Sequence, residues 1–127
     1  SGQHGAAGRL QAMAYMLLIV EPVGQRAERG VEEGQRLYER MLGFTGELKE
    51  AGVLMASSSL ATPATRLRRE AGAPFVTDGP FTEAKEMVGG FFLIDVPGRA
   101  EAVQWAVRCP ASSWATVEVR ETGPCFT

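Results

Sequence analysis

Ala14-Tyr-Met-Leu-Leu-Ile-Val20 is the segment that decides the fold, because it is apolar at every position. Its length is typical of a strand, and Glu21-Pro22 ends it sharply. Phe91–Val96 has nearly the same character, and Pro97-Gly98 ends it. Successive strand residues point to opposite faces of a sheet, so both segments present apolar side chains on both faces. We therefore predict that they form the central strands of one sheet.

The remaining elements follow from periodicity. Val31–Ala51 carries apolar residues at helical spacing, and Gly52 suits the position that ends a helix. Trp114–Glu121 alternates between apolar and polar residues, as a strand with one covered face does. The other predicted elements are a loop over 22–30, a strand over Val53–Leu60, a hairpin of Thr65–Glu70 and Pro74–Thr77, a helical turn over Thr82–Glu86, a strand over Val88–Val96 and a helix over Arg99–Arg108.

This order predicts an α+β fold with the ferredoxin-like split βαβ topology, an antiparallel sheet and the hairpin as an insert. Helices on one side of such a sheet cover only one of its faces. Because the central strands are apolar on both faces, something must also cover the open face. A second copy of the same sheet is the economical answer, so we predict a homodimer with face-to-face sheets.

The composition is that of an ordinary globular protein, with 45% hydrophobic and 22% charged residues in a chain of 127. The length predicts one domain, which we place at residues 13–127. Residues 1–12 lack a periodic pattern, and we interpret them as a tag or a disordered extension.

Charge and hydropathy argue against two classes of partner. The net charge is −2 and no basic stripe is present, so we expect no nucleic-acid partner. No apolar run approaches the roughly 20 residues that span a bilayer, so we expect no membrane partner. We find no signal-peptide pattern. Cys109 and Cys125 do not make a disulfide framework, which favours a reducing compartment and a cytoplasmic location.

Several catalytic machineries need residues that the predicted domain lacks. The one histidine, His4, lies in the N-terminal extension. Zinc sites, serine triads and cysteine–histidine pairs need a histidine or a thiol cluster in the folded body. We also find no glycine loop of the kind that cradles phosphates. The sequence therefore predicts neither a metal nor a cofactor.

The segment Val76-Thr-Asp-Gly-Pro-Phe-Thr-Glu-Ala-Lys-Glu86 resembles the signature of the DGPF-domain branch of the YCII-related proteins. The resemblance continues through Gly89–Ile94 and covers essentially Met13 to Arg120. Further support comes from Tyr15–Leu18, Arg108–Pro110 and Val117–Arg120.

The resemblance implies a dimeric α+β barrel with a ligand-sized pocket beneath the helices, near the signature. Some YCII relatives look like enzymes on small cyclic or aromatic compounds that use a histidine–aspartate pair. That pair cannot be carried over, because the body has no histidine. Relatives also often carry an acidic residue near the position of Ser57-Ser58-Ser59. Most members of the DGPF branch have no assigned reaction, and some occur beside, or fused to, extracytoplasmic-function sigma factors.

Within the signature, Asp78 is the candidate catalytic residue. It precedes Gly79-Pro80, and proline favours an extended residue before it, which can present the carboxylate at a strand end. In an apolar pocket, burial would raise the pKa of this carboxyl and suit it to general-base work. The alternative is that Asp78 only caps the turn. Lys85 can pair with Asp78 or bind an anionic ligand, and the alternative for it is a surface ion pair.

Four more residues are candidate ligand contacts. Ser57 and Ser59 share one face of a predicted strand, where they are expected as polar lining rather than nucleophiles. Gly89 and Gly90 remove side chains at the entry to a central strand. Such glycines mark a bulge or a close approach of the backbone, and the alternative is room for a ligand.

Two functions remain open from the sequence. The first is binding of a small molecule in the barrel pocket, with a cofactor-independent lyase or isomerase reaction as its catalytic form. The second is a non-catalytic regulatory or accessory role linked to sigma factors of the extracytoplasmic-function class.

Overall fold

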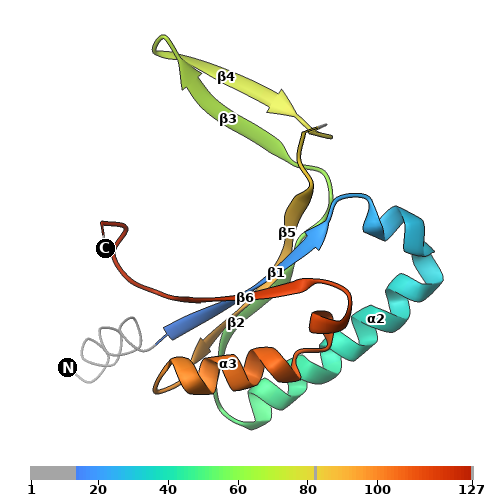
Figure 1. Cartoon of the computed structure of the whole chain (residues 1–127), viewed down its shortest axis with the longest axis vertical. Coiled ribbons are helices and arrows are strands. Elements are labelled where there is room, and N and C mark those ends of the chain that lie inside the picture. Colours follow the sequence, from blue (N-terminus) through green and yellow to red (C-terminus); the bar gives the residue numbers. More distant parts are fainter. Residues whose placement is uncertain (1–13, 82, 127) are drawn as a thin grey trace.

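The computed structural model describes residues 14–81 and 83–126. The predicted extension over 1–12, its histidine and Thr82 lie outside the described residues. The elements in chain order are β1 (Ala14–Pro22), α2 (Gln25–Glu50), β2 (Leu54–Ser59), β3 (Thr65–Glu70), β4 (Ala73–Asp78), β5 (Glu86–Asp95), α3 (Arg99–Arg108), the 3-10 helix η1 (Pro110–Ser113) and β6 (Thr116–Glu121) (Figure 1).

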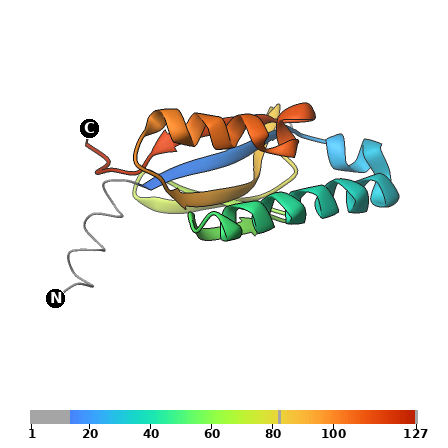
Figure 2. The ribbon, with the colours of Figure 1, turned by 90° about the horizontal axis from the view of Figure 1, so that it is seen from below.

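The main sheet has four antiparallel strands in the order β2-β5-β1-β6. This is the predicted α+β, ferredoxin-like arrangement, with the two most apolar strands at the centre. Both long helices lie on one face of the sheet, α2 beside β2 and α3 beside β6 (Figure 2). Among residues 14–81 and 83–126, no helix lies on the other face of the sheet (Figure 2).

The core fills the space between the sheet and the helices. Its fully buried side chains come from both layers: Leu17 and Ile94 from the sheet, Phe44 and Leu48 from α2, and Cys109 after α3. The ring of Phe44 meets Phe92 edge to face, with the ring centres 5.2 Å apart. Aromatic pairs in this geometry gain more than their buried area alone provides. The predicted apolar stripe of the first helix therefore does face the sheet at its C-terminal half.

Two local predictions were wrong. The predicted loop over 22–30 is helical from Gln25 onward, and only Gly30 departs from helical geometry, with φ 84°. The predicted helical turn over 82–86 is not formed by its described residues. Glu86 already pairs with Pro22 as the first residue of β5, and Val23 N–H donates to the Lys85 carbonyl at 2.9 Å. Pairing with the end of β1 therefore outweighs the local helix preference of this short segment.

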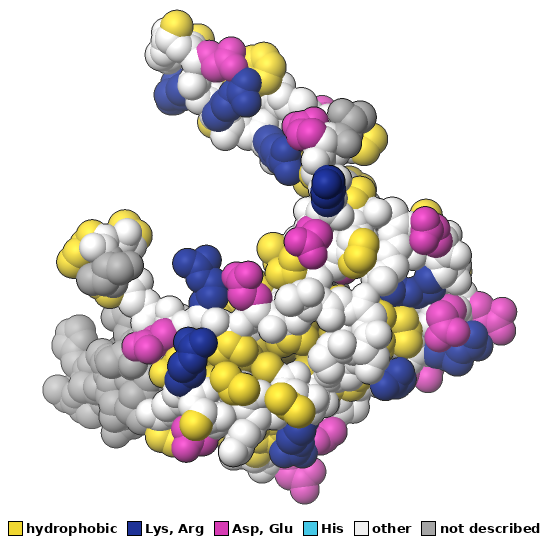
Figure 3. Space-filling view, in the orientation of Figure 1, with side chains coloured by type: hydrophobic (Ala, Val, Ile, Leu, Met, Phe, Trp, Pro, Cys, Tyr) yellow, Lys and Arg dark blue, Asp and Glu magenta, His cyan; other side chains and the backbone are white. Residues whose placement is uncertain are grey.

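The predicted hairpin insert forms a separate two-stranded sheet of β3 and β4, which we call the arm (Thr65–Asp78). The arm stands away from the body, on the side opposite to the helices (Figure 1). The space-filling view shows it as a narrow projection that carries arginines and hydrophobic side chains (Figure 3).

Candidate functional site

A cavity of about 840 Å³ lies between α2 and the sheet. Ligand pockets for small molecules commonly have volumes of about 300–1,000 Å³. Apolar side chains form most of its wall: Ile19, Leu37, Tyr38, Met41, Leu42, Phe92 and Trp114. Polar residues gather at one end, toward the beginning of α2 and the end of β2: Glu21, Arg26, Arg29, Ser57, Ser58 and Ser59. The cavity is thus apolar along its length and polar at one end.

Gly30 shapes the helical wall of this cavity. Its φ of 84° interrupts α2, so the turn Gln25–Arg29 is set at an angle to the rest of the helix (Figure 1). Glycine adopts positive φ without the steric cost that a Cβ brings. Because of this angle, the side chain of Arg26 reaches the end of β1, the residue after β2 and the bulge in β5. Gly30 itself lines the cavity.

The polar end of the cavity is built on an ion pair between Glu21 and Arg26. Glu21 is 6% exposed and is the one buried charged residue in the described part of the chain. Arg26 Nε and Nη2 donate to its two carboxylate oxygens at 3.0 and 2.8 Å. Arg26 Nη1 also donates to the Leu60 carbonyl at 2.7 Å, and Nη2 to the Gly89 carbonyl at 3.2 Å. One guanidinium therefore ties together β1, the end of β2 and β5.

Gly89 makes room for this ion pair. A Cβ at residue 89 would lie 1.7 Å from Glu21 Oε1 and 2.8 Å from Arg26 Nη2. The register of β1 against β5 shifts between Ile19 and Val20, which leaves Gly89 in a bulge. At Gly90, a Cβ would lie 2.9 Å from the Ser58 carbonyl oxygen. The prediction of a bulge or a close backbone approach at these glycines is confirmed, and the space that they leave is occupied by protein.

A chain of side-chain contacts joins the start of α2 to the loop before β6. Gln25 Nε2 donates to the Trp114 carbonyl at 2.8 Å, and Arg29 Nη2 donates to Gln25 Oε1 at 2.9 Å. Further along the helix, the guanidinium of Arg40 lies 5.3 Å from the Trp114 ring centre. These contacts hold α2 against η1 and β6 on the side of the cavity away from β2.

The cavity contains four of the six residues predicted as a site and leaves two outside. Ser57, Ser59, Gly89 and Gly90 all line it. In the register of β2 with β5, Ser57 pairs with Phe92 and Ser59 with Gly90, so both hydroxyls lie on the face that the helices cover. Both serines are exposed in the single chain, and neither hydroxyl has a hydrogen-bond partner within residues 14–81 and 83–126.

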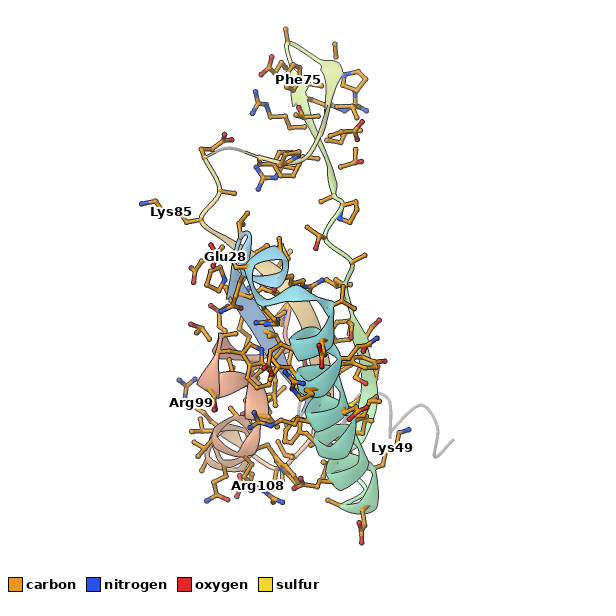
Figure 4. All side chains as sticks on the ribbon, turned by 90° about the vertical axis from the view of Figure 1, so that its right-hand side faces the viewer. Glu28, Lys49, Phe75, Lys85, Arg99 and Arg108 are labelled. Carbon is orange, nitrogen blue, oxygen red and sulfur yellow. The ribbon has the colours of Figure 1, made fainter. Side chains whose placement is uncertain are left out.

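Asp78 and Lys85 lie elsewhere. Asp78 is the last residue of the arm, is exposed, and accepts a hydrogen bond from Thr65 Oγ1 at 2.6 Å. The side chain of Lys85 points away from the body (Figure 4). The structure thus separates the most specific motif of the sequence from the cavity. The contact of Asp78 with Thr65 joins the two strands of the arm, rather than capping the turn that follows it.

The charged residues of the cavity were missed from the sequence. A signal for Glu21 was present, because Tyr15, Leu17, Ile19 and Glu21 alternate along β1 and share its covered face. A carboxylate in that row must be buried or paired. For Arg26 and Arg29 the signal was hidden, because the segment that carries them was predicted to be a loop.

Two buried side chains outside the cavity have raised pKa values. Burial raises the pKa of the Cys109 thiol, so this cysteine is held in its protonated form. Desolvation, with the nearby Glu121 carboxylate, raises the pKa of Tyr15, whose hydroxyl donates to Glu121 Oε1 at 3.2 Å. Both shifts favour the neutral form of the side chain, and neither group faces the cavity.

Within the described residues, no group of three or more histidine, cysteine, aspartate or glutamate side chains is placed to hold a metal ion. In the same part of the chain, no helix combines the length and the apolar character that crossing a membrane requires.

Comparison with known proteins places this chain in a family. The chain is 34% identical over 96 residues to an uncharacterised protein of Rhizobium meliloti (strain 1021), a match that covers 74% of this chain and 77% of that protein. The YCII-related domain matches residues 13–124, which include every element of the main sheet, both helices and the arm. With nearly the whole chain matched, the protein is a member of the YCII-related family.

Proposed function

We propose that this protein binds a small molecule in the cavity beneath α2. The observation that carries the proposal is the cavity itself: about 840 Å³ of space with an apolar wall and a polar end. The cavity is open to solvent, since Tyr38 and Leu42 in its wall are 53% and 51% exposed, so a small molecule can enter it directly.

The lining indicates the chemistry of the ligand. Phe92, Leu37 and Met41 suit an apolar or aromatic body. The hydroxyls of Ser57 and Ser59, which have no partner among the described residues, suit one or two oxygen atoms on that body. Hydroxyl groups both donate and accept hydrogen bonds, so phenols and carboxylic acids both fit. We therefore propose a compact, mainly apolar ligand with oxygen substituents at one end.

Glu21 is the one carboxylate among the described residues that line the cavity. A lyase or isomerase reaction without a cofactor needs a group that moves a proton at the substrate. Glu21 lines the cavity, whereas Asp78 lies outside it. Arg26 holds both carboxylate oxygens of Glu21, which fixes the orientation of the group. In a catalytic form of this function, Glu21 takes the role that the sequence suggested for Asp78.

A matched pair of variants tests the cavity. Ala27 lines it, and the next residue along the helix, Glu28, does not. We expect Ala27→Trp to fill the cavity and Glu28→Trp to leave it open. Benzoate, salicylate and catechol serve as probes in thermal unfolding, because a ligand that binds the folded state raises its stability by RT ln(1 + [L]/Kd).

The proposal predicts that at least one probe raises the unfolding temperature of the native chain and of Glu28→Trp, and that Ala27→Trp loses the increase. An increase of the same size in Ala27→Trp would place the binding elsewhere and overturn the proposal. The absence of any effect on the native chain would contradict the proposed ligand chemistry.

We further propose that the chain acts as a homodimer through the open face of the sheet. Leu18 pairs with Phe91 and Met16 with Leu93 across β1 and β5, all on the face away from the helices. Their side chains are partly exposed in the single chain. An apolar sheet face of this kind needs a cover, and a second copy of the same face supplies one.

The charges on the open face also suit a second copy. Glu118 pairs with Leu18 and Arg120 with Met16, so β6 presents one acid and one base next to the apolar residues. Neither has an ion-pair partner within the described residues. A two-fold axis places each residue of a patch against the same patch, so Glu118 of one copy can meet Arg120 of the other.

A further inference from the structure

The arm is a two-stranded sheet that is separate from the main sheet. All residues of β3 are exposed, and only Thr77 in β4 is partly covered. An isolated two-stranded hairpin is marginally stable in water, and additional packing is needed to hold it. The arm is therefore a candidate for contact with something outside the chain.

The two faces of the arm differ. On one face, the guanidinium of Arg66 stacks 3.7 Å from the Phe81 ring centre, and that of Arg68 lies 4.9 Å from the Phe75 ring centre. Each guanidinium lies over one face of a ring, and Phe75 remains 45% exposed. On the other face, Leu67 pairs directly with Val76, and their exposed fractions are 63% and 58%. The Leu67–Val76 face is thus an uncovered apolar patch.

The base of the arm is built to fix its direction. Thr65 Oγ1 donates to Asp78 Oδ1 at 2.6 Å, and Gly79 N–H donates to the Ala64 carbonyl at 2.9 Å. A Cβ at residue 79 would lie 3.1 Å from the Phe81 ring, so glycine lets this ring pack against the turn. The signature Asp78–Phe81 therefore anchors the arm. A docking element held in this way loses little entropy when it binds.

The position of the arm indicates its partner. The arm projects on the side of the sheet opposite to the helices, which is the side of the open apolar face (Figure 1). A second copy that covers that face would lie beside the arm. Arg66 and Arg68 already pair with Glu83 and Glu70, so the apolar residues of the arm, rather than its charges, are available for this contact.

We propose that the arm is a dimerisation clasp, in which the Leu67–Val76 face of each copy packs against the partner copy. The proposal rests on the homodimer proposed above and adds a second contact surface to it. In this proposal the segment Asp78–Phe81 holds the clasp in its position relative to the sheet.

Variants of the exposed patch test the clasp without disturbing the core. The double variant Leu67→Asp/Val76→Asp changes only exposed side chains of the arm. The control Val31→Asp changes a side chain that is 78% exposed on α2, on the helical side of the molecule. Circular dichroism checks the fold of each variant, and sedimentation velocity over a concentration series gives the dimer dissociation constant.

We expect the native chain and Val31→Asp to dimerise with the same dissociation constant. We expect Leu67→Asp/Val76→Asp to weaken the dimer by about 100-fold, because apolar contacts are lost and carboxylates enter the interface. A dimer of unchanged affinity in the double variant would overturn the clasp and leave the sheet-to-sheet dimer standing. A monomeric native chain would overturn both proposals.

Hydrogen exchange provides a second measurement. In the dimer, the backbone amides of the arm should exchange more slowly than in the diluted monomer, because packing against the partner suppresses local opening. Equal exchange of the arm amides at high and low concentration, in a chain that does dimerise, would also overturn the clasp.

Discussion

The carboxylate of Glu21 fills the space that a side chain at residue 89 would occupy. The distance from a Cβ placed on Gly89 to Glu21 Oε1 is 1.7 Å, far below any van der Waals contact. The two residues lie 68 positions apart in sequence and meet because the bulge in β5 lies beside the end of β1. This relationship fixes the polar end of the cavity, and it can be tested directly.

Gly89→Ala should destabilise the protein. The added methyl group must displace Glu21 or Arg26, and overpacking of this kind costs about 1–3 kcal/mol. The matched control is Gly46→Ala in α2, where a Cβ would meet no atom within 4 Å. That control should gain up to about 1 kcal/mol, because alanine is the better helix former. Urea unfolding of both variants measures the changes, and a stability loss of equal size in both would contradict the steric explanation.

Arg26→Met should destabilise the chain more than the double variant Glu21→Met/Arg26→Met. The single change leaves the Glu21 carboxylate, 6% exposed, without its partner. An unpaired buried charge is costly, whereas removal of both charges leaves an apolar pair of similar volume. Because Arg26 is itself about one third exposed, we expect a loss of about 1–3 kcal/mol in the single variant. If the double variant were less stable than the single one, the ion pair would not be the source of the loss.

Cys109 and Cys125 should differ in reactivity. Cys109 is buried and its pKa is raised by desolvation, whereas Cys125 is exposed. The thiolate is the reactive form, so a thiol reagent should label one cysteine per native chain and both after unfolding. Peptide mapping identifies the labelled residue. Equal rates for both thiols in the native chain would contradict the burial of Cys109.

The raised pKa of Cys109 also gives a pH dependence. The unfolded chain loses this thiol proton at a lower pH than the folded chain does. The free energy of unfolding should therefore fall as the pH rises through the ordinary thiol range toward the raised value. In Cys109→Ala the free energy of unfolding should fall less over this pH range, because the titrating thiol is absent. Urea unfolding of both chains from about pH 7 to about pH 10 measures the difference.

Leu93→Lys should weaken the dimer, because it places a charge in the open apolar face of the sheet. The control is Val107→Lys on α3, a side chain that is 73% exposed on the helical side. Sedimentation velocity should show the control dimerising like the native chain and Leu93→Lys dissociating at higher concentration. If all three chains had the same dimer affinity, the proposal that the open face forms the interface would be wrong.

The sequence predicted the layout of the main sheet well. β1 and β5 could be placed at its centre because their apolar character on both faces is incompatible with an edge strand beside solvent. β6 could be placed at an edge because Val117 and Val119 alternate with polar residues. The order of strands in the sheet could be predicted because it follows from the apolar pattern within each strand, and no contact between distant residues had to be known.

The start of α2 could not be predicted, since the contacts that support it are distant in sequence. Pro22, Gly24 and Gly30 all indicate a loop locally. The segment becomes helical where Arg26 reaches Glu21 and the carbonyls of Leu60 and Gly89, and where Gln25 reaches the Trp114 carbonyl. Only the folded sheet supplies these partners.

Four of the six residues predicted as a site line the cavity, and the other two do not. Ser57, Ser59, Gly89 and Gly90 could be placed near one another because each lies on a predicted strand, where alternate residues share a face. Asp78 was chosen because its motif is specific, but a motif does not show where in the fold its residues lie. Asp78 ends the arm and so lies outside the cavity, and the direction of the arm cannot be predicted from the local sequence.

Asp78 itself gives a clear prediction. Asp78→Ala should remove the hydrogen bond from Thr65 and weaken the base of the arm. Because the site is exposed, the free energy of unfolding should fall by at most about 1.5 kcal/mol. It should leave probe binding in the cavity unchanged. Titration of a bound probe into both chains measures this, and loss of binding in the variant would restore Asp78 as a ligand-contacting residue.

Mapping of amide chemical shifts tests the central claim, a ligand cavity beneath α2, most directly. A bound probe, titrated into the isotopically labelled chain, should shift the resonances of Ile19, Ser57, Ser59 and the α2 residues Gly34–Thr45 that line the cavity. The resonances of the arm should stay in place. Shifts confined to the open sheet face, around Leu18 and Leu93, or to the arm would contradict the account and would place ligand binding on the other side of the molecule.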